Sequence, residues 1–105
     1  MKIIETENAP KAIGTYSQAV KVNGFLFISG QIPLDPSTME LVEGIENQIN
    51  QVFENINQIL KADGMDFSNV VKLSVLLEDL SHFEKVNEIM ASIFSKPYPA
   101  RAAYE

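Results

Sequence analysis

Arg101 is the only arginine in the chain and the strongest candidate for a residue that binds a small molecule. A guanidinium presents a planar set of donors that can hold a carboxylate through two hydrogen bonds. Pro97 and Pro99, just before it, limit the freedom of the backbone. A small carboxylic acid is therefore the predicted ligand. A surface arginine that pairs with one of the 14 acidic side chains is an equally simple interpretation.

Ser29 directly follows the apolar segment 25–28, where a strand is expected to end in a polar corner. Gly30 can take backbone angles that other residues avoid, and Pro33 and Pro36 stiffen the path beyond it. Binding residues are often found in loops that a rigid scaffold positions. The Ser29 hydroxyl would either contact a ligand or bond to nearby backbone, and the backbone role is favoured for the serine taken alone.

Tyr16 and Asn87 are two further candidates. Tyr16 is either a core ring whose hydroxyl finds one partner or a gate over a pocket. Asn87 lies four residues after Phe83 and three before Met90, on the apolar face of an expected helix. Its amide therefore needs a partner, and a bond to the backbone is the simplest one. His82 falls in the first turn of the same helix, and we assign it no role.

The composition argues against several classes of function. With no cysteine and one histidine, the chain cannot form disulfides or use a thiolate, and no metal site is expected. A net charge of −6 would repel nucleic acid. No apolar run approaches the roughly 20 residues of a membrane span, and the N-terminal segment turns acidic too early for an export signal. We expect no nucleic-acid or membrane partner and a cytoplasmic location.

The first half of the chain predicts a hairpin and a helix. Asn23-Gly24 separates the apolar segments 20–22 and 25–28, which is typical of a two-residue β-hairpin. From Ile45 onward, apolar residues recur at three- and four-residue spacing, which predicts a helix. Gly64 is well placed to end it.

The second half predicts a strand, a helix and a last strand. Segment 70–77 is almost continuously apolar and β-branched, which predicts a strand that is buried on much of both faces and lies inside the sheet. Ser81 and Glu84 have the spacing of a capping box that opens the second helix. The segment 101–105 would add the final strand. We expect one domain, residues 1–105, with an α+β fold in which two helices cover one face of a mixed β-sheet.

Several short motifs, in the same order and spacing, resemble those of the RidA (YjgF) family of reactive intermediate deaminases, also called endoribonuclease L-PSP. They span the chain and are Asn8-Ala9-Pro10, Ile13-Gly14-Thr15-Tyr16-Ser17-Gln18-Ala19, Ser29-Gly30-Gln31-Ile32-Pro33, Gln51-Val52-Phe53-Glu54-Asn55-Ile56, Val71-Lys72, Val86-Asn87 and Pro99-Ala100-Arg101. The resemblance implies the chorismate mutase-like fold and a homotrimer whose sheets form a barrel, with clefts between subunits.

The resemblance also implies a reaction. Enamine and imine intermediates such as 2-aminoacrylate, 2-iminobutanoate and 2-iminopropanoate would be hydrolysed to 2-oxo acids and ammonia without a cofactor. Arg101 would be the catalytic residue that grips the substrate carboxylate, and Tyr16, Ser29 and Asn87 would line the substrate-binding cleft. Two alternatives stay open: a non-catalytic module that binds small 2-oxo acids, and a ribonuclease, which the acidity of the chain disfavours.

The sequence departs from the family pattern in places. Family members usually continue beyond the arginine strand to a last strand with a glutamate thought to orient the water, and we expect residues 1–105 to lack that strand. Glu105 does not match the glutamate, so substrate binding is better supported than turnover. Thr15 and Ala103 replace a usual proline and cysteine. Met39 replaces a glycine after Pro36, and a positive φ there would strain it.

Overall fold

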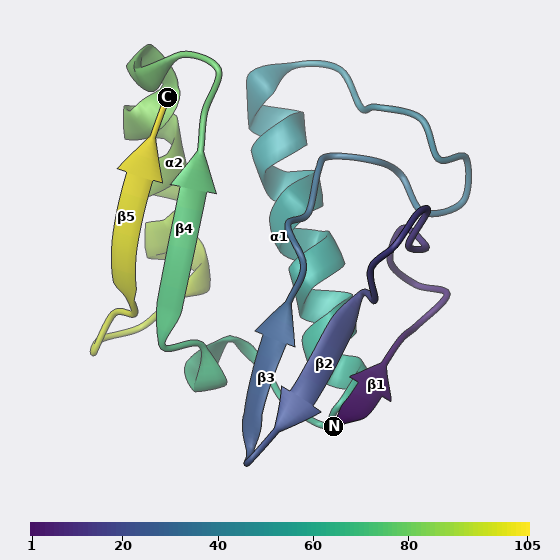
Figure 1. Ribbon diagram of the computed structural model, residues 1–105. Helices are drawn as coiled ribbons and strands as arrows, with labels where there is room; N and C mark the ends of the chain where they lie inside the picture. Colours follow the sequence, from purple (N-terminus) through teal and green to yellow (C-terminus); the bar gives the residue numbers. More distant parts are fainter. The chain divides into compact units, whose positions relative to one another are not determined.

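The computed structural model describes residues 1–105, which form two compact units, residues 1–65 and 66–105. The first unit holds a three-stranded antiparallel sheet and one helix, and the second holds a parallel pair of strands and one helix (Figure 1). The expected α+β class with two helices is confirmed, and the strand hydrogen bonds form one sheet in each unit. Neither helix is both long and apolar enough to cross a membrane.

The sheet of the first unit consists of β1 (Lys2–Ile4), β2 (Ala19–Val22) and β3 (Phe25–Ile28), in that order. The predicted hairpin between β2 and β3 is confirmed. Its turn residues Asn23 and Gly24 both have positive φ, 50° and 81°, as a tight hairpin turn requires. Strand β1 was not predicted, because three residues are too few to show an alternating pattern.

Helix α1 (Ile45–Ala62) confirms the predicted helix and its C-terminal signal. Gly64 has a φ of 70°, and its amide donates to the carbonyl of Lys61. The Met65 amide donates to the carbonyl of Leu60, which completes a Schellman motif. The buried core cluster of this unit joins the helix to the first strands and comprises Ile4, Ala9, Ala19 and Ile59.

An ion pair connects the sheet to the end of α1. Lys21 Nζ, from β2, lies 2.9 Å from Asp63 Oδ2. The Asp63 side chain is only 7% exposed, and this oxygen has no other polar partner. Because an unpaired buried carboxylate is strongly unfavourable, Lys21 is the group that makes this position acceptable for an acid.

Asn55 holds the corner that follows β3. It is fully buried on α1, and its Nδ2 donates to the carbonyls of Ile32 at 3.3 Å and Leu34 at 3.1 Å. Its Oδ1 accepts from Gln51 Nε2 at 2.8 Å. Buried backbone carbonyls need such partners, so Asn55 fixes the path of the chain beyond Ser29.

Asn55→Leu keeps the approximate size of the side chain and removes all of these bonds. We expect it to lower the free energy of unfolding by about 2–3 kcal/mol, since two carbonyls and one amide lose their partner. Urea denaturation measures the change. Gln51→Ala removes only the half-buried end of the network and should cost less than about 1 kcal/mol. Equal losses in the two variants would contradict this role of Asn55.

Met39 occupies a turn position that favours glycine, as its replacement of a family glycine suggested. Its φ is 60°, and its amide donates to the carbonyl of Asp35 at 2.7 Å. The Ser37 hydroxyl and amide both donate to Asp35 Oδ1, which lowers the pKa of this carboxyl group. The turn is therefore well bonded, and Met39 bears the strain of a left-handed backbone.

Met39→Gly and Met39→Ala remove the same side-chain contacts, but only alanine keeps the Cβ atom that opposes a positive φ. We expect the glycine variant to be more stable than the alanine variant by about 1 kcal/mol. Thermal or urea unfolding of both proteins measures this difference. An alanine variant as stable as the glycine variant would show that the turn relaxes without strain.

The second unit is built on two parallel strands, β4 (Lys72–Leu76) and β5 (Ala100–Tyr104), with Leu73 opposite Arg101. The short helix η1 (Phe67–Asn69) precedes β4, and η2 (Leu80–His82) and α2 (Phe83–Ile93) lie between the two strands. Helix α2 lies along one face of the pair (Figure 1). Its buried side chains are Val86, Ile89 and Met90.

The prediction that segment 70–77 is buried on much of both faces is wrong within its unit. Exposure alternates along β4: Leu73 and Val75 are half-buried, whereas Lys72, Ser74 and Leu76 are exposed, Leu76 at 77%. The physical reason is that β4 has one partner strand and one helix in this unit, so only one of its faces is covered.

The predicted capping box of α2 is also wrong. Ser81 lies inside η2, and Asp79 Oδ1 accepts a hydrogen bond from its amide at 2.8 Å. This bond lowers the pKa of Asp79. Helix α2 begins at Phe83 after His82, which makes no side-chain cap. A carboxylate two residues ahead is a strong acceptor for the Ser81 amide, so the helical turn starts earlier than the capping-box spacing indicates.

Candidate functional site

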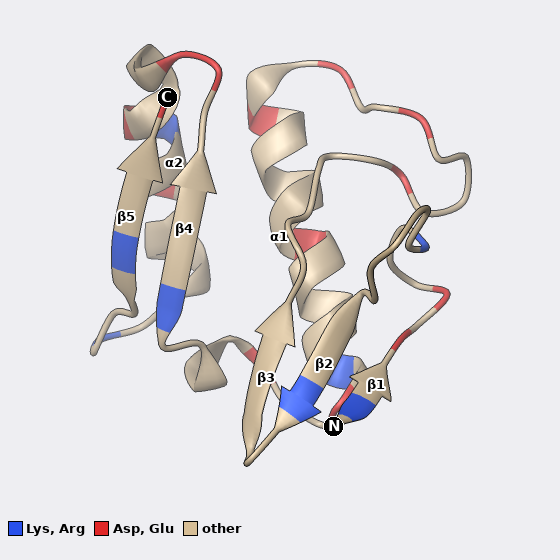
Figure 2. Ribbon diagram, viewed as in Figure 1, with Lys and Arg blue, Asp and Glu red and all other residues tan.

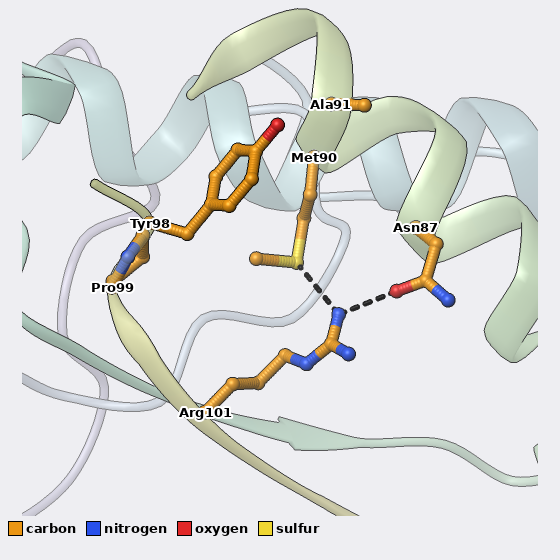
Figure 3. A pocket seen from close by; sticks show the side chains of 6 residues that line it. All are labelled: Asn87, Met90, Ala91, Tyr98, Pro99 and Arg101. Atoms are coloured by element: carbon orange, nitrogen blue, oxygen red, sulfur yellow. Dashed lines mark hydrogen bonds between the residues drawn. The ribbon is translucent and has the colours of Figure 1, made fainter. Parts of the chain in front are cut away.

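Arg101 extends from β5 toward Asn87 and Met90 of α2 (Figure 3), and a third side chain of α2, Phe83, also contacts its guanidinium. Its Nη1 atom donates to Asn87 Oδ1 at 2.5 Å and lies 3.5 Å from Met90 Sδ. The guanidinium carbon lies 4.6 Å from the centre of the Phe83 ring, a cation–π contact. The arginine is exposed, so its charge stays accessible to a ligand from solvent.

The three contacts come from one helical face. Phe83, Asn87 and Met90 are spaced by four and three residues, so their side chains lie in a row along α2. Two neighbouring parallel strands need a crossover connection, and α2 is the crossover between β4 and β5. This topology brings the row against the strand that carries Arg101.

A cavity of about 430 Å³ opens beside the guanidinium. Figure 3 shows the Arg101 guanidinium between Met90 and Asn87, with the Tyr98 ring on the far side of Met90. The lining residues are Asn87, Met90, Ala91, Tyr98, Pro99 and Arg101. A cation next to thioether, methyl and ring surfaces suits a small organic acid, whose carboxylate and hydrocarbon parts need different surroundings.

The predicted backbone bond of Asn87 is wrong. Asn87 is exposed, and its carbonyl oxygen accepts from Arg101. It lies at the edge of the apolar face, where β5 supplies a charged donor. A guanidinium has donors only, so the oxygen of the amide must face it and Nδ2 must point elsewhere. Asn87 and Arg101 are therefore brought together, as the family resemblance implied.

Ser29 and Tyr16 belong to the first unit. The Ser29 hydroxyl donates to the carbonyl of Ser17 at 2.6 Å, so the expected backbone role is confirmed. Tyr16 is 53% exposed, and its hydroxyl oxygen accepts from the amide of Ile13 at 3.4 Å. The alternative of a core ring is therefore wrong for Tyr16. Its aromatic face is available for contact with another molecule.

Gln18 and Asn55 are positioning residues that the sequence analysis missed. Gln18 is 4% exposed; its Oε1 accepts from the Thr6 amide at 2.7 Å, and its Nε2 donates to the Pro10 carbonyl at 2.8 Å. It fixes the segment that carries Tyr16, as Asn55 fixes the corner after Ser29. Gln18 directly precedes Ala19, and Asn55 lies next to Ile56 and one helical turn before Ile59. A polar amide among apolar positions is the signal that could have identified both residues.

Basic residues gather at one end of the first unit. Lys2 on β1 lies opposite Lys21 on β2, and Lys61 is in the last turn of α1, near both strands in Figure 2, while Lys21 is paired with Asp63. The net charge of −6 still disfavours a polyanion, whereas a single carboxylate meets one well-held guanidinium at Arg101.

The sequence model of endoribonuclease L-PSP matches residues 6–105. The chain belongs to the RidA/YjgF family. The resemblance drawn from short motifs is thereby confirmed. Over 105 residues the chain is 51% identical to the 2-iminobutanoate/2-iminopropanoate deaminase of Mus musculus, a match that covers 99% of this chain and 78% of the mouse protein.

Solved structures of the RidA/YjgF family share the fold. RidA from the Antarctic bacterium Psychrobacter matches with a TM-score of 0.95 and 53% identity, covering 99% of this chain and 85% of that one. Escherichia coli TdcF with bound serine matches with a TM-score of 0.93 and 36% identity, covering 99% and 84%. The expected α+β fold of the RidA/YjgF type is therefore shown.

Asn87→Asp tests whether Arg101 is the available cation. The new carboxylate would lie beside Nη1 and form an internal ion pair that competes with an added acid. We expect about fivefold weaker binding of 2-oxobutanoate, measured by calorimetry, without loss of thermal stability. Asn50→Asp adds the same charge on the exposed face of α1 and serves as the control. Equal affinities of the two variants would contradict the site.

Proposed function

We propose that this chain hydrolyses reactive imines, 2-iminobutanoate and 2-iminopropanoate with their enamine tautomers, to 2-oxo acids and ammonia. The observation that carries the proposal is the guanidinium of Arg101, held by α2 at the edge of an open cavity. Two relatives support it: the mouse protein is named as this deaminase, and the TdcF structure holds serine, a small molecule with a carboxylate.

The reaction asks little of the protein beyond binding and orientation. The enamine first tautomerises to the imine. Water then adds to the imine carbon, and the tetrahedral adduct loses ammonia as a carbonyl group forms, so no electrons are transferred to another molecule. Arg101 binds the adjacent carboxylate and offsets its charge, which keeps that carbon electrophilic and fixes its position in the cavity.

The proposal includes a homotrimer with sites between subunits, in which Tyr16 and Ser29 line the cleft. The exposed Tyr16 ring offers a surface for ligand contact. The Ser29 hydroxyl uses its hydrogen to bond Ser17, so its oxygen keeps lone pairs that can accept from the substrate nitrogen. Asn87 reaches the cleft through its contact with Arg101.

We expect the 105-residue chain to accelerate the release of 2-oxobutanoate and ammonia from threonine in the presence of a threonine dehydratase. The dehydratase generates the imine, and the chain hydrolyses it. Arg101→Ala should return the release to the rate without the chain, because the carboxylate loses its bidentate partner. Time courses at low dehydratase concentration separate this step from the formation of the imine.

Lys72→Ala is the matched control. Lys72 lies on β4 opposite Ala100 and makes no hydrogen bond to Arg101, so this variant removes one positive charge from the same strand pair. It should accelerate release as the wild type does. Undiminished activity of Arg101→Ala would refute the assignment of Arg101. Saturable binding of 2-oxobutanoate without any acceleration would instead favour the metabolite-binding module. RNA cleavage that survives purification and disappears in Arg101→Ala would favour a ribonuclease.

A further inference from the structure

We infer that Phe83 is a positioning residue for Arg101 and that the guanidinium therefore presents its Nε–Nη2 edge to the substrate carboxylate. This inference rests on the proposed function, because it requires a carboxylate bound at Arg101. It assigns a role to Phe83, which the sequence analysis treated as part of an apolar helix face.

The Phe83 ring restrains the guanidinium without using any of its hydrogen atoms. The guanidinium carbon lies 4.6 Å from the ring centre, where the negative face of the ring attracts a cation. Phe83 is half-buried and is the first residue of α2, so the helix fixes its backbone. A carboxylate at this position would pair with Arg101 and compete with the ligand, whereas a ring leaves every donor free to bind elsewhere.

The remaining contacts select one edge of the guanidinium. Nη1 donates to Asn87 Oδ1 and is also in contact with Met90 Sδ, so this nitrogen is directed at α2 (Figure 3). Nε and Nη2 have no partner in the chain. A carboxylate can bind either the pair Nη1 and Nη2 or the pair Nε and Nη2. Only the second pair leaves the bonds to α2 intact.

Restraint of this kind strengthens binding, because the arginine side chain then loses less conformational entropy when the ligand binds. An arginine side chain has many rotamers, and holding it in one of them on binding weakens the affinity. Because Phe83 and Asn87 already hold Arg101 in the ligand-free chain, much of this entropy loss does not occur on binding. The two residues thus act through Arg101 rather than on the substrate.

Because Arg101 is the only arginine, the free chain gives a single arginine Nε–H signal in a nitrogen-15 NMR spectrum. We expect this signal to shift and then saturate as 2-oxobutanoate is added. We also expect its position in the ligand-free protein to change in Phe83→Leu, which removes the ring current. Saturable binding that leaves the Nε–H signal unmoved would overturn the assignment of the Nε–Nη2 edge.

Affinity tests the role of Phe83 itself. We expect Phe83→Leu to weaken binding of 2-oxobutanoate about fivefold and Phe83→Tyr, which keeps the ring face, to stay within about twofold of the wild type. A residue needed only for packing would lower thermal stability without this dependence on the ring, so melting is measured for each variant. If Phe83→Leu fails to fold, Phe83→Met, which also removes the ring and keeps an apolar side chain, replaces it, with the same expected loss of affinity.

The outcomes separate the inference from the function that it presupposes. If the wild type binds no small 2-oxo acid, the proposed function and the inference both fail. If binding is lost in Arg101→Ala but Phe83→Leu binds as tightly as the wild type, the positioning role of Phe83 fails and the carboxylate site at Arg101 stands.

Discussion

The parallel pairing of β4 with β5 is the constraint on which the candidate site depends. Two neighbouring parallel strands cannot be joined by a tight turn, so the chain must cross over, and α2 is that crossover. As the chain crosses from β4 to β5, one row of α2 side chains packs against β5. Phe83, Asn87 and Met90 occupy the row, and Arg101 lies opposite. A cation is thus held by a ring, an amide and a thioether, none of which neutralises it.

The polar side chains that matter for the site are buried in the first unit and exposed in the second. In the first unit, the buried amides of Gln18 and Asn55 bond to backbone carbonyls and amides and so fix the loops around Tyr16 and Ser29. An amide has donors and acceptors but no charge, which suits a buried position. In the second unit, the charged group stays exposed and keeps its affinity for an anion. Loops fixed by hydrogen bonds and an accessible cation are the properties on which the proposed imine hydrolysis relies.

Local structure was largely predictable because local chemistry causes it. The Asn23-Gly24 hairpin, the apolar period of α1 and the glycine that ends it are all properties of neighbouring residues. The wrong predictions concern the start of α2 and the burial of β4, where the local sequence is compatible with more than one arrangement. Asp79 rather than Glu84 bonds near the start of α2, and the exposure of β4 reflects how many partners its unit provides, which no segment encodes alone.

The sequence by itself determined the family and the chemistry available to Arg101, because both depend on residue identity and order. The tertiary structure decided which side chains meet. Arg101 and Asn87 are 14 residues apart in the chain, yet Nη1 and Oδ1 form a hydrogen bond, and the same fold seats the Phe83 ring under the guanidinium. Such contacts follow from the crossover of α2 between two strands, a long-range pairing that no local pattern specifies.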